Sequence, residues 1–428
     1  MITKISISGY KSIEKIELEL GRINVFIGEN GAGKSNILEA IALAGAAAAE
    51  KLDNEFLSSR GIRVTRSEYM RPAFPGSNSS TPVTLNVKSG KKEELFFNLL
   101  NDNSLYSKWQ STVTSPRLPL AAETFKNAIE RYVEIVPPEK TEVEHIKDAE
   151  DLVSTLSAEI DSLLARLKEL KTQGLDETKG VSIPFGGKNL EFKKLYNSFS
   201  IKNFDCMKRL QQFIIYSPEN SFLRKFDSES QIEPLGINGE GLLKLLYFYA
   251  GQDQDKTLEK VKTSLKNLNW FADFNTVSAA NEGHLVLKDK FLDENISDFD
   301  HKSANEGFFF LLFYFLLFNS ALTPSFFAID NIDASLNPKL CRQLIFELTN
   351  AANINDKQAI LTTHNPAVLD GLNLDDDEQR LFVISRNIKG RTKVKRIFKP
   401  EIPSDVINPP KLSELFLRGM LGGLPKGF

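Results

Sequence analysis

The chain has 428 residues, which is enough for two or three structural units. Its net charge of −3 and its pI of about 6.0 exclude an overall basic protein of the kind that coats nucleic acid. A hydrophobic content of 41% is typical of a globular chain, and two distant cysteines, Cys206 and Cys341, favour a reducing cytoplasmic location. No apolar leader precedes the strand-like first residues, which also favours the cytoplasm.

The first fifty residues predict a strand hairpin, then a buried strand and a helix. Apolar and polar residues alternate in Ile5–Ile7 and Ile16–Leu20, as in half-buried strands. The mainly apolar run Ile23–Ile27 predicts a buried strand, and Asn36–Leu43 has apolar residues at helical spacing. Between them, Gly28–Ser35 fits the pattern G-x-x-x-x-G-K-[ST] at every fixed position.

This order of strand, glycine-rich loop and helix predicts a nucleotide site. Asn30, Gly31 and Gly33 belong to the loop whose backbone N–H groups surround phosphate oxygens, beside the positive end of a helix dipole. Lys34 is expected to reach the β- and γ-phosphates, and Ser35 is expected to ligate Mg²⁺. We therefore predict ATP and Mg²⁺ as the cofactors.

The middle of the chain is predicted to contain a β-rich segment followed by a long helix. Residues 60–120 contain short apolar runs broken by proline and glycine, which predicts a β-rich segment. From 140 to 170 an apolar stripe recurs every three or four residues, which predicts a coiled-coil-like helix. This helix is either a core or lid helix, or a projecting arm that meets a partner or a second copy. The stripe consists of Leu152, Leu156, Ile160, Leu163, Leu167 and Leu170.

The second half predicts strands that alternate with helices. A strand is expected at Gln212–Tyr216, helices within 240–270 and a hairpin over Asn275–Asp289. Phe308–Phe318 is entirely apolar but too short to span a bilayer, so we expect a buried helix and no membrane contact.

Two continuous apolar strands, Phe326–Ile329 and Gln358–Leu361, follow that helix and are typical of a parallel sheet covered on both faces. Leu381–Ile384 and Thr392–Ile397 predict a late hairpin. The expected fold class is α/β. The expected domains are an amino-terminal lobe (1–120), a helical insertion (121–210), a carboxyl-terminal lobe (211–400) and a tail (401–428).

Two further residues are expected beside the phosphates because each follows a predicted parallel strand. Asp330 ends the apolar run at 326–329 in the Walker B pattern and is expected to hold Mg²⁺ together with Ser35. His364 follows the next strand, where an imidazole can contact the γ-phosphate or the attacking water.

With both Walker motifs placed about 300 residues apart, the chain resembles the ABC-type ATPase heads of SMC, RecF and overcoming-lysogenization-defect (OLD) proteins, which belong to the AAA family ATPases. The resemblance implies an ABC-type P-loop head with a mixed sheet, in which two heads enclose two ATP molecules. Ser303–Gly307 is similar to the signature that contacts the γ-phosphate of the opposite head, through Ser303 or Asn305 and near Gly307. Ser335–Asn337 matches the D-loop, and Lys11 matches a basic residue near the nucleotide.

One position departs from this family. Its members usually carry Glu after the Walker B Asp as the general base, and here that residue is Asn331. An amide orients water but does not accept its proton, so we expect weak hydrolysis. Asp333 is the alternative base two residues further on. No Q-loop glutamine is recognisable between the Walker motifs.

The predicted function is that of an ATP-binding subunit that forms a homodimer or higher homo-oligomer and regulates a separate effector. By resemblance to the ATPase subunit of Septu-type antiphage systems, the expected effector is a nuclease, such as an HNH enzyme. The alternative is an active SMC/RecF-like ATPase acting on DNA in repair or recombination, and a third possibility is a static scaffold. The basic clusters at 88–92 and 386–396 are either DNA contacts or solvated loops.

Overall fold

The computed structural model describes residues 1–76, 78, 80–90, 93–104, 107–115, 182–185, 188–191, 201, 204–226, 233–252, 256–278, 283–293, 298–400 and 409–423. The chain divides into two compact units, residues 1–114 with 205–428 and residues 115–204. In the smaller unit, β7 (Ser182–Phe185) pairs antiparallel with β8 (Lys188–Glu191). The helix predicted over 140–170 lies outside the described residues, so its apolar stripe and its role stay predictions.

In the larger unit, a five-stranded antiparallel sheet confirms the predicted hairpin and the β-rich segment after it. Its order is β2-β1-β4-β5-β6. Ile5 and Ile7 on β1 lie opposite Val87 and Leu85 on β4, and all four are buried. The strands are β1 (Ile2–Tyr10), β2 (Ile13–Glu19), β4 (Val83–Ser89), β5 (Glu93–Leu100) and β6 (Gln110–Thr114).

A six-stranded sheet of order β16-β15-β3-β14-β13-β9 confirms the predicted parallel core. Five of its strands are parallel and β16 is antiparallel, so the late hairpin is also confirmed. The Asn24 side chain donates to the Ala359 carbonyl at 3.1 Å across 335 residues of sequence. The strands are β3 (Ile23–Ile27), β9 (Ile215–Tyr216), β13 (Phe326–Ile329), β14 (Gln358–Thr362), β15 (Gln379–Arg386) and β16 (Thr392–Ile397).

The strand predicted over Gln212–Tyr216 is shorter than expected. Only Ile215 and Tyr216 form β9, because this edge strand pairs with β13 at two positions. Phe213 and Ile214 are buried without being part of the strand. The Ile214 carbonyl nevertheless accepts from the Ala328 N–H at 2.9 Å, so hydrogen bonding to β13 extends one residue beyond β9.

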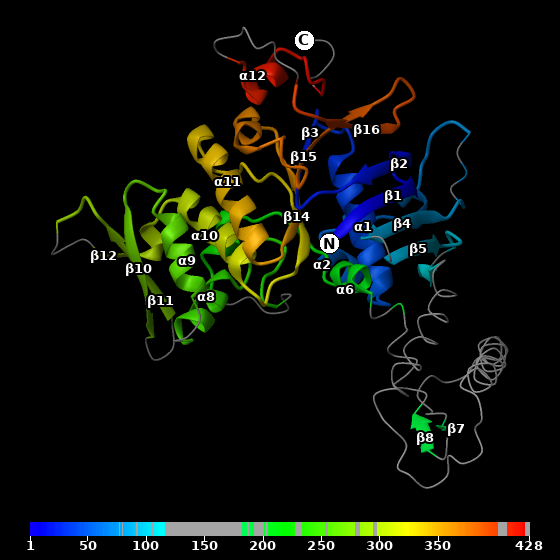
Figure 1. The fold of residues 1–428 in the computed structure, drawn as a ribbon, viewed down its shortest axis with the longest axis horizontal. Coiled ribbons are helices and arrows are strands. Elements are labelled where there is room, and N and C mark those ends of the chain that lie inside the picture. Colours follow the sequence, from blue (N-terminus) through cyan, green and yellow to red (C-terminus); the bar gives the residue numbers. More distant parts are fainter. Residues whose placement is uncertain are drawn as a thin grey trace, which may run out of the picture. The chain divides into compact units, whose positions relative to one another are not determined.

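Helices cover the six-stranded sheet on both sides (Figure 1). In that view α10 and α11 lie on one side of β14, and α1 lies on the other with the five-stranded sheet. Every residue from Phe308 to Phe318 is buried, as predicted. The described helices are α1 (Lys34–Ala48), α2 (Asn54–Ser59), α6 (Asp205–Gln211), α7 (Asn220–Leu223), α8 (Leu242–Ala250), α9 (Thr257–Leu265), α10 (Glu306–Asn319), α11 (Pro338–Ile354) and α12 (Leu412–Leu417), with 3₁₀ turns η1 (Ser67–Met70), η3 (His301–Ser303) and η4 (Pro366–Gly371).

A small antiparallel sheet follows α9 and precedes α10. Its strands are β10 (Phe271–Ser278), β11 (Gly283–Asp289) and β12 (Asp298–Asp300), which confirms the predicted hairpin. Phe271 and Trp270 lie against Phe308 at ring-centroid distances of 5.8 and 6.0 Å, so this sheet is packed against the start of α10. Within the part of the chain described, no helix is both long enough and apolar enough to cross a bilayer.

Candidate nucleotide-binding site

The predicted phosphate-binding loop joins the end of β3 to the start of α1 and is packed tightly against β15 and β16. Gly28 has φ +149°, and a Cβ atom there would lie 2.0 Å from the Ile384 carbonyl oxygen. Gly33 has φ +109°, and its Cβ would lie 2.3 Å from Thr392 Oγ1. Side chains are therefore excluded at both positions by contact as well as by backbone conformation.

Lys34 is held inside this loop. Its side chain is buried, and Nζ donates to the carbonyl oxygens of Gly28 at 2.8 Å and Glu29 at 3.2 Å. Burial lowers the pKa of Lys34, while the charges of Asp330 and Glu29 act against that shift. The Lys34 ammonium is thus held within the loop by two carbonyl oxygens, which phosphate oxygens can replace as acceptors.

The two predicted metal ligands lie side by side. Ser35 Oγ donates to Asp330 Oδ2 at 3.3 Å, although the two residues are 295 apart in sequence. The other Asp330 oxygen accepts from Thr362 Oγ1, and Thr362 Oγ1 accepts from the Asn331 N–H at 2.9 Å. Strand order explains this meeting: β14 lies between β3 and β13, and all three strands are parallel. A hydroxyl and a carboxylate are oxygen ligands of the type that Mg²⁺ uses beside phosphates, so these residues fit the ion.

The two candidate bases have different surroundings. Asn331 is exposed and has φ +55°, in the left-handed region. Asp333 accepts from Thr363 Oγ1 at 2.6 Å. After burial, which is the main cause, the Asp333 charge also raises the pKa of Tyr314 and of Cys341, the latter to about 11. The Asp333 carboxylate therefore lies near buried side chains of α10 and α11, and its role as the base stays a prediction.

His364 is exposed at the end of β14, within electrostatic range of the loop. Partial burial of the ring and the Lys34 charge lower its pKa, while Asp333 and Asp330 act against the shift. The lowered pKa therefore favours the neutral imidazole. A neutral ring can accept a hydrogen bond from water or donate one to a phosphate oxygen.

The buried carboxylate of Glu39, on α1, binds the predicted residue Lys11 and also Arg63, which was not predicted from the sequence. Glu39 is 1% exposed and accepts from Tyr10 Oη at 3.0 Å, from Lys11 Nζ and from Arg63 Nε. Burial lowers the pKa of Arg63, but Glu39, Tyr10 and Asp330 outweigh it, so the net shift is upward. Arg63 therefore lies close enough to Asp330 to interact electrostatically with its carboxylate. No local sequence pattern marks this arginine.

The predicted signature residues lie at the start of α10. Ser303 ends η3 and is exposed, and Asn305 caps α10 by accepting from the Phe308 N–H at 2.9 Å. A Cβ on Gly307 would lie 3.5 Å from the Ser335 carbonyl oxygen, so the predicted D-loop lies beside the signature. Among the described residues, no hydrogen bond or ion pair joins 303–307 to the phosphate-binding loop.

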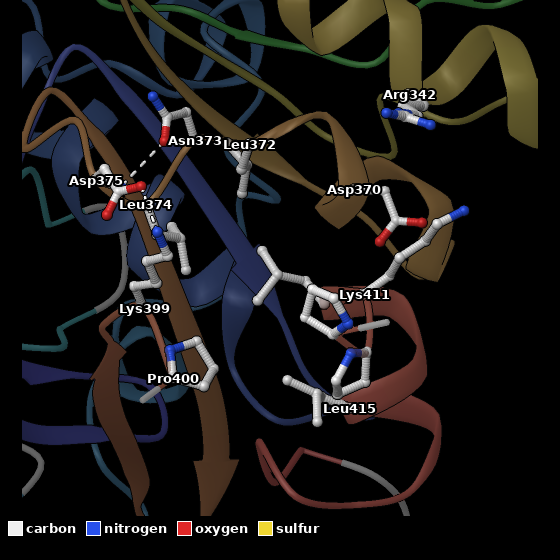
Figure 2. A pocket seen from close by; sticks show the side chains of 13 residues that line it. Arg342, Asp370, Leu372, Asn373, Leu374, Asp375, Lys399, Pro400, Lys411 and Leu415 are labelled. Carbon is white, nitrogen blue, oxygen red and sulfur yellow. Dashed lines mark hydrogen bonds and ion pairs between the residues drawn. The ribbon is translucent and has the colours of Figure 1, made fainter. Parts of the chain in front are cut away.

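A hollow of about 290 Å³ lies apart from these residues, beside the segment that carries α12 (Figure 2). Asp370 accepts from Ser413 N–H at 2.9 Å and from Ser413 Oγ at 2.8 Å, which fastens α12 to η4. Figure 2 shows Asp375 joined to Asn373 and to Lys399 on the other side of the hollow. None of the residues predicted for the nucleotide lines this hollow.

The sequence matches two known protein families. Residues 1–307 match the family described as AAA ATPase domain, which is more than two thirds of the sequence. The chain belongs to this AAA ATPase family. Residues 307–370 of the AAA ATPase match a second family, described as AAA domain, putative AbiEii toxin, Type IV TA system. Both Walker residues, Lys34 and Asp330, lie within the matched ranges.

Curated relatives match a smaller part of the AAA ATPase. Over 98 residues it is 34% identical to the DNA replication and repair protein RecF of Bacillus cereus (strain G9842) and to that of Bacillus mycoides (strain KBAB4). The match covers 22% of this chain and 25% of each RecF. The chain therefore spans about a quarter of the length of these relatives.

Solved structures of SMC heads share the fold. An SMC head bound to the C-winged helix domain of ScpA has a TM-score of 0.50 and 12% identity, covering 93% of this chain and 98% of that one. An SMC head domain from Thermotoga maritima has a TM-score of 0.43 and 10% identity, covering 92% and 98%. The match at a TM-score of 0.50 confirms the predicted ABC-type α/β head as the fold. The chain therefore combines membership of the AAA ATPase family with the fold of an SMC head, and that family implies the use of nucleotide and Mg²⁺.

Proposed function

We propose that this AAA ATPase binds ATP tightly, closes as a dimer or higher homo-oligomer around it, and thereby regulates a separate effector protein. One observation carries the proposal. Lys34, Ser35 and Asp330 converge at the ends of β3 and β13, while the residue next to Asp330 is an amide. Such a site has what it needs to hold ATP and lacks the usual group for accepting a proton from water.

The residues of this site have separable roles. Lys34 exchanges two loop carbonyls for β- and γ-phosphate oxygens, and Ser35 and Asp330 hold Mg²⁺. Bound Mg²⁺ neutralises charge on those oxygens. Asn331 orients a water molecule without taking its proton, so bound ATP persists and the closed state is long-lived.

The effector is proposed to be a nuclease, such as an HNH enzyme, in antiphage defence. The match of 307–370 to a domain described as a putative AbiEii toxin supports a role in a bacterial toxin or defence pair. The second candidate function is DNA repair or recombination, and the partial match to RecF favours it. Under either function, Ser303, Asn305 and the backbone near Gly307 of one head contact ATP held by the other.

Phosphate release with Mg²⁺ and ATP, measured with and without duplex DNA, tests the proposal. We expect slow release that DNA does not accelerate, and sedimentation as a larger species with ATP than with ADP. Lys34→Ala is the matched control, because it removes ATP binding and should sediment as the small species under all conditions. Rapid turnover that DNA stimulates would instead support the repair function.

The effector is tested by co-expressing the ATPase with the product of an adjacent gene and measuring DNA cleavage. We expect cleavage to differ between wild type and Lys34→Ala in the presence of ATP. Equal cleavage by both would contradict regulation through the nucleotide.

A further inference from the structure

A chain of hydrogen bonds connects the D-loop to α7, a short helix that the sequence analysis did not single out. Ser335 Oγ donates to Glu306 Oε2 at 3.0 Å, and Asn220 Nδ2 donates to Glu306 Oε1 at 3.1 Å. Arg224 Nε in turn donates to Asn220 Oδ1 at 2.8 Å. Glu306 is thus held from two sides, by the D-loop and by α7.

The other end of the Arg224 side chain binds backbone carbonyls in η3, just before the signature segment 303–307, and at Ala304 within it. Nη1 donates to the carbonyls of His301 at 3.2 Å and Lys302 at 3.0 Å, and Nη2 donates to the Ala304 carbonyl at 2.6 Å. The guanidinium carbon lies 4.6 Å from the centre of the Phe309 ring. Three carbonyls within four residues are therefore directed toward a single planar guanidinium, whose donors are fixed in a fork, unlike those of a lysine ammonium.

The helix that carries these residues is anchored to the Walker B strand. It begins four residues after β9, where the Asp330 N–H donates to the Tyr216 carbonyl at 2.8 Å. The Glu219 N–H, just before α7, donates to the Asn238 carbonyl at 2.9 Å. The metal-ligand strand, the signature and the D-loop are thereby connected through one short segment.

We propose that Arg224 is a positioning residue for the signature segment, and that Asn220 and Glu306 extend this control to the D-loop. Within the described part of the chain, Arg224 forms no ion pair with a carboxylate and directs its donors to neutral oxygens. The carbonyls of His301, Lys302 and Ala304 accordingly face Arg224, while Ser303 stays exposed for an opposing γ-phosphate. This inference rests on the proposed closure of two heads around ATP.

Arg224→Ala and Arg224→Lys in the full chain test the proposal, with Lys225→Ala as the matched control. Lys225 is exposed, adjacent and of equal charge, and its ammonium lies over the Phe222 ring. We expect faster amide hydrogen exchange at 301–308 and at 333–337 in both Arg224 variants. ATP affinity of the separate head should stay within about twofold, while ATP-dependent association should weaken roughly tenfold. Lys225→Ala should match wild type in all three measurements.

The outcomes separate this inference from the proposed function. Unchanged exchange at 301–308 in Arg224→Ala overturns the positioning role, whether or not heads associate. If exchange rises but wild type never associates with ATP, the proposed function fails and the positioning role stands. A mere loss of packing would raise exchange throughout the chain, and that result would also count against the proposal.

Asn220→Ala and Ser335→Ala provide a second test if Arg224→Ala does not fold. Each removes one hydrogen bond to Glu306, and Asn220→Ala also removes the acceptor of Arg224 Nε, while the three carbonyl contacts of Arg224 stay in place. We expect faster exchange at 333–337, and we expect the double variant to lose less association than the product of the single losses. Independent, multiplicative losses would contradict the connection through Glu306.

Discussion

Replacing Asn331 by Glu places a carboxylate at the position proposed for the general base, and the structure indicates how this change affects stability. Asn331 has φ +55°, and its N–H is held by Thr362 Oγ1 at 2.9 Å, so the left-handed backbone is fixed from outside the residue. Asparagine tolerates this conformation better than glutamate does. The amide is therefore suited to the backbone here as well as being inactive as a base.

The two effects have different magnitudes. A positioned general base contributes about 10²–10⁴ in rate, equivalent to roughly 3–5 kcal/mol of barrier. Left-handed strain costs about 1 kcal/mol in folding free energy and tends to shift the new carboxylate from its ideal position. We therefore expect Asn331→Glu to increase phosphate release by roughly a hundredfold, at the low end of that range, and to lower the free energy of unfolding by about 1 kcal/mol.

Phosphate release under single-turnover conditions with Mg²⁺ measures the first effect, and denaturant unfolding measures the second. Asn331→Gln is the control, because it carries the same strain and no base. It should lose the same stability and gain no rate. The increase in the Glu variant should also disappear as the pH falls below the carboxyl pKa, near 4.3. An equal rate increase in the Gln variant would refute the reasoning.

Three further results are expected. Lys34→Ala should weaken binding of a labelled ATP analogue by roughly a hundredfold or more, since it removes the buried cation from the loop; unchanged affinity would remove the site assignment. Gly28→Ala should lower the free energy of unfolding by roughly 2–5 kcal/mol because its Cβ meets Ile384 O, whereas Gly31→Ala, which meets nothing within 4 Å, should cost only the strain of its positive φ. Folding lowers the pKa of His364 from about 6.5, the value of a histidine in the unfolded chain, so just below pH 6.5 the unfolded chain binds more protons than the folded one. Wild type should therefore lose more stability than His364→Gln as the pH falls through that region.

The parts of the site that depend on neighbours in sequence were predictable. Lys34 and Ser35 follow from a fixed pattern, and Asp330 and His364 follow from their places after apolar strands. The parallel sheet was predictable for the same reason, because strands buried on both faces are continuously apolar. These features share one property, namely that their signal lies within about ten residues of the chain.

The remaining features arise from contacts between distant segments. Arg224 binds carbonyls about 80 residues away, and a backbone carbonyl has no identity in a sequence. Arg63 meets Glu39 because of the turn after α2, and nothing in its own surroundings distinguishes it from a surface arginine. The requirement for glycine at position 28 comes partly from Ile384, more than 350 residues later.

The pairing of β3 with β14 has a consequence for how this protein is made. Ile23–Ile27 is buried throughout, yet its partner strand is about 335 residues further along the chain. A ribosome adding 5–20 residues each second needs roughly 20–70 seconds to cover that distance. During that time the hairpin of β1 and β2 can form, but the strand that carries the phosphate-binding loop has neither of its parallel neighbours. The strand before the predicted phosphate-binding loop therefore gains both parallel neighbours only after residues 358–386 have been synthesised, and the nascent chain must protect an apolar strand until then.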